Sequence, residues 1–203
     1  MTSSTSPVPH GQQTFSLRSW RDLVDKLNFE IDEFDRTQET DPTPSFRAFR
    51  AINGAVTAWH IGDWFWEWLV LHRPDLVPHA AAHLEVDLRN VHVNDRKGMI
   101  CALSKGMATK NRSLAICRTI TNAFKHVRSE HFVDMLTTHP VHVTRRMSNS
   151  PNAEPEQFFA LRVFAENQSL DMGDVLKKAA ARWTALFRDC GLWSITEGWL
   201  VGE

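Results

Sequence analysis

The segment 45–71 constrains the fold of this chain most, because apolar side chains cover most of its circumference when it is drawn as a helix. From Phe46 to Trp59 they recur at steps of three and four residues, the period of an α-helix, and four more follow in adjacent pairs: Phe46, Phe49, Ile52, Val56, Trp59, Phe65, Trp66, Leu69 and Val70. A helix that is apolar on most sides has to be surrounded by other elements. We therefore expect a central helix here, and Gly54 and Gly62 predict the close approach of a neighbouring backbone.

A second helix is predicted before the central one. Apolar residues from Trp20 to Phe34 recur at helical steps, and Ser19 with Asp22 forms a capping pattern for a helix start. Residues 1–14 are rich in Ser, Thr, Pro and Gln and are expected to be a disordered leader.

After the central helix, weaker signals precede another clear helix. Prolines punctuate a short helix that is expected to end near Leu88, and a basic stretch from Asp95 to Ala108 is predicted to be helical in part. Ser113 caps the next helix, which is predicted from Leu114 to about Arg128.

Near residue 140 the period changes from that of a helix to that of a strand. Apolar and polar residues alternate around 141–143 and 159–163, which predicts an antiparallel β-hairpin over about 140–166. Residues 166–169 are expected to form a turn. A last helix is predicted over about 172–190, with Asp171 as its N-cap and Gly191 as its C-terminal stop.

The chain has 203 residues, and we expect residues 15–203 to form one mainly α domain, a helical bundle with a small antiparallel β-element near the C-terminus. The net charge is −1, so a nucleic-acid role has to rest on a local patch. No apolar run is long enough to predict a membrane span, and three scattered cysteines are typical of the reducing cytoplasm, where we expect the protein.

Polar residues form a stripe on the predicted central helix. They belong to one line of residues at alternating steps of three and four, beside the apolar face, which also includes two valines: Asn53, Val56, His60, Asp63, Glu67 and Val70. Burying such groups is costly unless they are paired. Two interpretations stay open, a His60–Asp63 pair that satisfies itself in the core and a polar site at a helix–helix seam.

A second constellation lies on the helix that Ser113 caps. Arg118, Asn122 and His126 are four residues apart and share one face, with Thr121 and Lys125 at its border. A neighbouring guanidinium lowers the pKa of an imidazole, which favours the neutral ring that can accept a proton.

This face belongs to a basic segment of the chain. Asp95 is the one acidic residue from 95 to 128, against eight basic ones: Arg96, Lys97, Lys105, Lys110, Arg112, Arg118, Lys125 and Arg128. Such a segment in a nearly neutral protein suggests a phosphate-containing ligand. The alternative is a solvated face that pairs with the acidic first helix.

A capped helix with the pattern Asn-x-x-x-His inside a helical bundle resembles the HEPN superfamily. By this resemblance Asn122 matches the polar position of the family motif and His126 its catalytic histidine. Thr121 stands where the family has an arginine, and Arg118, one turn earlier, is the residue that would supply the guanidinium.

The resemblance implies an RNA-directed protein, a metal-independent ribonuclease of a toxin or phage-defence type that works as a homodimer without a cofactor. His126 would take the proton of the ribose 2′-hydroxyl or protonate the leaving oxygen. Arg118 and Lys125 would stabilise charge on the phosphate, and Asn122 would orient the imidazole.

The remaining candidate residues complete this expected site. Lys125, Arg128 and Thr121 would bind the substrate, while His60 and Asp63 of the central helix would support the catalytic groups.

Two further functions are consistent with the same residues. A helical metalloenzyme, either a hydrolase or a di-iron-type oxygenase, would hold a divalent transition metal with His60, Asp63, Glu67 and His126. The other alternative is a non-catalytic interaction or regulatory protein, in which the polar stripe only specifies packing.

Overall fold

The computed structural model describes most of the chain. The described residues are 17–40, 44–92, 94–125, 138–145, 156–165 and 168–193.

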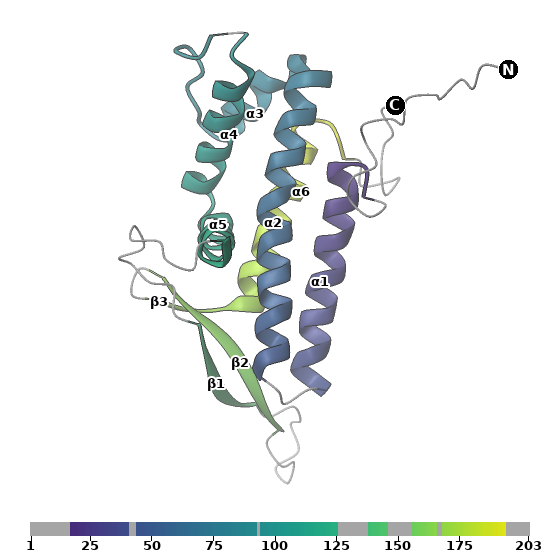
Figure 1. The fold of residues 1–203 in the computed structure, drawn as a ribbon, viewed down its shortest axis with the longest axis vertical. Coiled ribbons are helices and arrows are strands. Elements are labelled where there is room, and N and C mark those ends of the chain that lie inside the picture. The colour runs from purple at the N-terminus through teal and green to yellow at the C-terminus, as the bar shows by residue number, and fades with distance from the viewer. Residues whose placement is uncertain are drawn as a thin grey trace, which may run out of the picture.

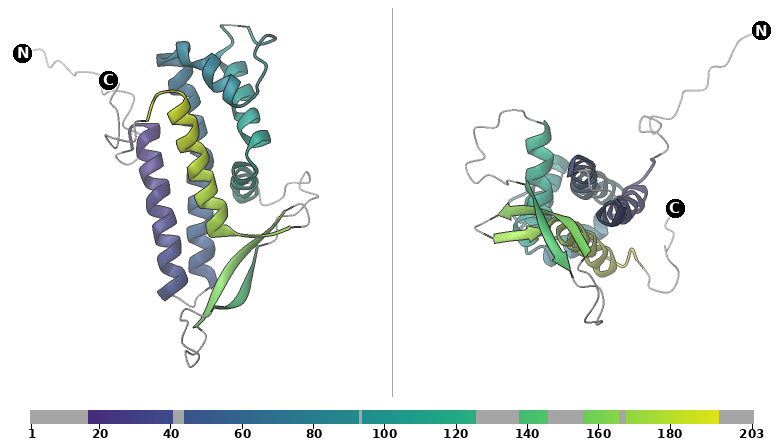
Figure 2. Two further views of the ribbon diagram at one scale, coloured as in Figure 1. Left: turned by 180° about the vertical axis from the view of Figure 1, so that it is seen from behind. Right: turned by 90° about the horizontal axis from the view of Figure 1, so that it is seen from below.

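Three long helices run side by side: α1 (Trp20–Thr40), α2 (Pro44–His72) and α6 (Met172–Asp189) (Figures 1 and 2). Figure 1 shows α5 (Arg112–Lys125) end-on beside α2, so this helix crosses the other three.

The remaining elements lie towards the two ends of these helices. A short 3-10 helix, η1 (Pro74–Leu76), leads into α3 (Val77–His83) and α4 (Arg96–Lys110). The sheet lies towards the opposite end (Figure 1). It comprises β1 (Thr138–Arg145), β2 (Glu156–Ala165) and β3 (Gln168–Asp171).

The predicted fold class is confirmed, a mainly helical structure with a small antiparallel sheet near the C-terminus. In the hairpin Thr138 faces Val163, and Arg145 faces Glu156. The expected turn over 166–169 was wrong in part, because Gln168–Asp171 pairs with the end of β2 as a third strand. Four residues are too few to show an alternating pattern that sequence reasoning could detect.

At Gly54 and Gly62 of α2 the expected approach of a neighbouring backbone was wrong, because side chains of α6 lie there. A Cβ on Gly54 would lie 2.9 Å from Leu176 Cδ1, and a Cβ on Gly62 would lie 3.4 Å from Trp183 Cη2. The neighbours are therefore side chains of α6 and not its backbone.

Among the helices in the described ranges, none is both long enough and apolar enough to cross a membrane.

A buried hydrogen bond joins the same two helices. Trp183 Nε1 donates to the carbonyl oxygen of Ala58 at 2.8 Å. The indole N–H of a fully buried tryptophan needs such an acceptor, and this one fixes α6 against the middle of α2.

The predicted N-terminal caps form at the starts of α1 and α6. Asp22 Oδ2 accepts from the amide of Ser19 at 2.8 Å, and the amide of Asp22 donates back to Ser19 Oγ at 3.3 Å. The carboxylate of Asp171 accepts from the amide of Asp174 at the start of α6. Gly191, at φ 68°, ends this helix in the left-handed conformation that favours glycine.

Between α2 and α5 the structure differs from the expected boundaries. The short helix ends at His83 and not near Leu88. The basic stretch is helical throughout Arg96–Lys110, because Asp95 Oδ1 caps it by accepting from the amide of Gly98 at 2.9 Å. The next helix starts at Arg112, two residues before the predicted Leu114, so Ser113 lies inside α5 and the prediction that it caps this helix was wrong.

Candidate functional site

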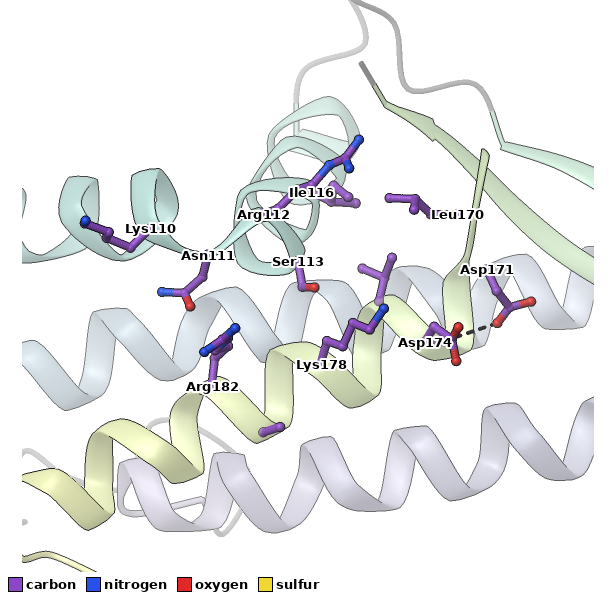
Figure 3. A pocket seen from close by; sticks show the side chains of 12 residues that line it. Lys110, Asn111, Arg112, Ser113, Ile116, Leu170, Asp171, Asp174, Lys178 and Arg182 are labelled. Atoms are coloured by element: carbon purple, nitrogen blue, oxygen red, sulfur yellow. Dashed lines mark hydrogen bonds between the residues drawn. The ribbon is translucent and has the colours of Figure 1, made fainter. Parts of the chain in front are cut away.

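A pocket of about 500 Å³ lies between the start of α5 and the first half of α6 (Figure 3). One wall comes from the junction of α4 and α5, and the other from β3 and α6. Its lining includes four basic side chains, Lys110, Arg112, Lys178 and Arg182, and two acidic ones, Asp171 and Asp174.

Two of the four cations are held by other parts of the protein. Lys110 Nζ forms an ion pair with Glu85. The guanidinium of Arg112 donates to Gln168 Oε1 at 2.6 Å and to the carbonyl oxygen of Ala165 at 2.8 Å. Figure 3 shows Arg112 directed away from the α6 wall. These two residues therefore hold the pocket in shape.

Lys178 and Arg182 are the cations left for a ligand. They lie four residues apart on α6, so they share one face, and both are exposed. Among the described residues, no carboxylate lies within ion-pair distance of either. Figure 3 shows Lys178 opposite Ser113 and Arg182 beside Asn111.

The opposite wall adds hydrogen-bond donors. The side-chain amide of Asn111 is not one of them, because it is buried and its Nδ2 already contacts the carbonyl oxygen and the sulfur of Met107, at 3.1 Å and 3.0 Å. The amide of Ala115 donates to the carbonyl oxygen of Asn111, so the amides before Ala115 have no acceptor within α5. The positive N-terminal end of α5 and the Ser113 hydroxyl therefore face the two cations of α6, so both walls offer hydrogen-bond donors to an anion.

The pocket has a different character at its sheet end. Asp171 and Asp174 lie there together, and Asp171 accepts from the Asp174 amide at 3.2 Å (Figure 3). Ile116, Leu170 and Val175 supply an apolar surface.

Lys177 shows what an internally paired lysine of α6 looks like. Its Nζ lies 2.8 Å from Asp35 Oδ2 of α1, and this hydrogen bond raises the pKa of the lysine. Lys177 does not line the pocket. It is therefore a control residue of the same type, adjacent in sequence to Lys178.

Sequence reasoning did not predict this pocket. The basic segment 95–128, for which a phosphate-containing ligand was predicted at the face of Arg118 and His126, supplies Lys110 and Arg112 to one wall. Lys178 and Arg182 were missed. The available signal was their spacing of four residues on the side of α6 away from its apolar face.

The predicted His60–Asp63 pair forms, but at the surface. His60 Nδ1 lies 2.6 Å from Asp63 Oδ2, and the side chains are 30% and 54% exposed. Asn53 and Glu67 are exposed too, and Glu67 pairs with Arg96 of α4. The expectation of a polar stripe in the core was wrong, because the buried face of α2 uses a different set of residues. That set is Ala51, Ala55, Ala58, Ile61, Phe65, Trp66 and Leu69.

On α5, two residues of the proposed catalytic face are described. Arg118 is exposed, and its guanidinium lies 5.5 Å from the ring centre of Trp59. Asn122 is partly buried on the same face. Thr121 cannot contact a substrate as expected, because it is fully buried and its hydroxyl donates to the Cys117 carbonyl oxygen at 2.8 Å.

The other residues expected on this face lie outside the described residues. These are His126, Arg128 and the side chain of Lys125. The predicted leader 1–14 also lies outside the described residues. Within the described ranges, no three His, Cys, Asp or Glu side chains gather where they could hold a metal ion.

Comparison of the chain with protein-family models, with curated proteins and with solved structures gave no match. Functional inference therefore rests on the chemistry of the pocket and of the α5 face.

Proposed function

We propose that this protein binds a small phosphorylated ligand in the pocket between α5 and α6. The observation that carries the proposal is the placement of Lys178 and Arg182. Both line the pocket, neither has an acidic partner among the described residues, and both face the start of α5. A phosphate group accepts charge-assisted hydrogen bonds from ammonium, guanidinium and helix-terminal amide donors alike.

The size and charge of the pocket favour a small ligand over a polymer. Its volume of about 500 Å³ lies in the range typical of small-molecule sites. The carboxylates of Asp171 and Asp174 bound it at one end, where they would repel the next phosphate of a nucleic-acid strand. The net charge of −1 also gives no long-range attraction for a polyanion.

The test is a calorimetric titration of the full chain with inorganic phosphate and with pyrophosphate. Loss of one charge-assisted hydrogen bond typically costs about 1.5–3 kcal/mol. Lys178→Gln and Arg182→Gln should therefore each weaken binding by about tenfold or more. Lys177→Gln removes the same charge one residue away and should leave the affinity unchanged.

Three results would overturn the proposal. The first is no heat of binding with either anion. The second is an equal loss of affinity in Lys177→Gln and Lys178→Gln. The third is tighter binding of a single-stranded RNA oligonucleotide than of pyrophosphate with the same dependence on Lys178, which would make RNA the ligand.

A second proposal concerns RNA cleavage at the outer face of α5, as the HEPN resemblance implies. The exposure of Arg118 and the position of Asn122 one turn later on the same face of α5 support it. His126→Ala should abolish cleavage of RNA in the absence of added metal and leave the thermal melt unchanged. Wild-type protein that leaves RNA intact would contradict this function and its implied homodimeric active form.

A further inference from the structure

The pocket is polarised along α6. Asp174, Lys178 and Arg182 follow one another at intervals of four residues, which corresponds to about 6 Å of rise per interval along a helix. Figure 3 shows the same order in space, with Arg182 at one end, Lys178 in the middle, and Asp174 beside Asp171 at the other end. A ligand that fills the pocket therefore meets cations at one end and carboxylates at the other.

The acidic end selects for hydrogen-bond donors. A carboxylate only accepts hydrogen bonds, so Asp174 gains nothing from a bare phosphate. Asp171 already accepts the amide of Asp174 as the cap of α6, whereas the carboxylate of Asp174 is exposed and free of ion pairs among the described residues. Asp174 is thus the group that would bind the part of the ligand beyond the phosphate.

Neutral donors suit this end better than a second cation. Lys177 and Lys178 follow Asp174 within one helical turn, and the charges of Asp174 and Asp171 act on Lys177. The two carboxylates are therefore already partly balanced by the ammonium group of Lys177. Hydroxyl groups can donate to Asp174 without adding positive charge beside these lysines.

From these observations we infer that the ligand is a phosphate ester of a short polyol, of the pentose phosphate kind. This inference rests on the proposed function, because it assigns the phosphate to Lys178 and Arg182. The hydroxyl groups then lie about one helical turn further along α6, at Asp174. The carbon framework between them packs on Ile116, Leu170 and Val175.

The experiment compares three probes by calorimetry: inorganic phosphate, ribose 5-phosphate and phosphoethanolamine. Wild-type protein should bind ribose 5-phosphate at least about tenfold more tightly than inorganic phosphate, since the added hydrogen bonds go to a charged acceptor. Asp174→Asn should weaken ribose 5-phosphate by about tenfold and leave inorganic phosphate unchanged or slightly tighter.

The control is Asp189→Asn, which changes an acid of the same helix whose Oδ2 lies 2.6 Å from His83 Nδ1, outside the pocket. It should leave both affinities unchanged. A thermal melt of each variant shows whether loss of an acid from the first turn of α6 has disturbed the helix, and Asp174→Glu should restore part of the ribose 5-phosphate preference.

The outcomes separate the two proposals. If inorganic phosphate binds through Lys178 but ribose 5-phosphate binds no tighter, or if Asp174→Asn affects both probes equally, the polyol inference fails and the phosphate pocket stands. Preferential binding of phosphoethanolamine would also overturn it, since Asp174 would then recognise an amine. If none of the probes binds, both proposals fail.

Discussion

The seam between α1 and α2 and the pocket between α5 and α6 both contain clusters of charged side chains, but they use them differently. In the seam, Glu30 is 5% exposed and receives Lys26 Nζ at 3.0 Å. Lys26 also donates to Thr57 Oγ1 at 2.6 Å, and Arg50 reaches Glu33 at 3.1 Å. Each of these charges has a partner within the protein.

In the pocket, two of the cations have no such partner. Lys178 and Arg182 stand near two other cations, and in the described part of the chain neither meets a carboxylate at ion-pair distance. Like charges that gather without partners destabilise a fold by repulsion. Charge in the seam therefore stabilises the protein itself, whereas charge in the pocket is suited to an anion from outside.

The largest expected effect tests the seam. Glu30→Ala should lower the free energy of unfolding by about 2 kcal/mol. The substitution removes a buried carboxylate from Lys26 and Arg50, and these two cations are too little exposed for water to replace it fully. Urea denaturation followed by tryptophan fluorescence measures the change. Glu33→Ala, at a more exposed carboxylate, should cost less, and equal losses in the two variants would show that burial of Glu30 is unimportant.

The next prediction separates the cations of the pocket from one another. Arg112→Ala should destabilise the protein by about 1–2 kcal/mol, because its hydrogen bonds to Gln168 and Ala165 attach α5 to the sheet. Hydrogen exchange of the β3 amides should rise in parallel. Arg188→Ala, in the exposed last turn of α6, serves as the control, and a similar loss there would argue against a special role of Arg112.

Salt should distinguish the two regions. Raising NaCl from about 0.1 M to about 1 M shortens the Debye length from about 10 Å to about 3 Å. The affinity for inorganic phosphate should fall several-fold, since Lys178 and Arg182 are exposed. The stability difference between wild type and Glu30→Ala should change little, because Glu30 is buried. Equal salt dependence of both quantities would remove the contrast between the regions.

The smallest expected effect concerns the contribution of Lys178 and Arg182 to the free energy of unfolding. The double variant Lys178→Gln, Arg182→Gln should unfold within about 0.5 kcal/mol of wild type, as exposed substitutions without partners do. A slight gain would agree with relief of repulsion. A loss above about 1 kcal/mol in the urea titration would mean that the two cations contribute to the fold and are not reserved for a ligand.

Some elements could be predicted because their signal lies within a few neighbouring residues. The helical period of 45–71 and the caps at Ser19 with Asp22 and at Asp171 are local patterns, and they correspond to α2 and to the starts of α1 and α6. The third strand, Gln168–Asp171, could not be predicted, because its partner β2 and not its own composition makes it a strand.

The candidate site shows the same division. A phosphate-containing ligand was predicted for the basic segment, at the face of Arg118 and His126, and this stays a prediction. Lys110 and Arg112 of the same segment line the pocket, but other protein groups hold both. The burial expected for the stripe of His60 and Asp63 was wrong, because periodicity shows which residues share a face but not whether that face is covered. On α2 the alanine and aromatic face is buried, and the polar stripe is not.

Spacing along the chain was thus sufficient for the long helices, the caps of α1 and α6, the hairpin and the basic character of one segment, because each depends on residues close to one another in sequence. The pocket depends on α5 crossing α6, which brings Ser113 opposite Lys178 although the two are far apart in sequence. No local pattern encodes that crossing, because it results from how all the apolar faces pack together at once.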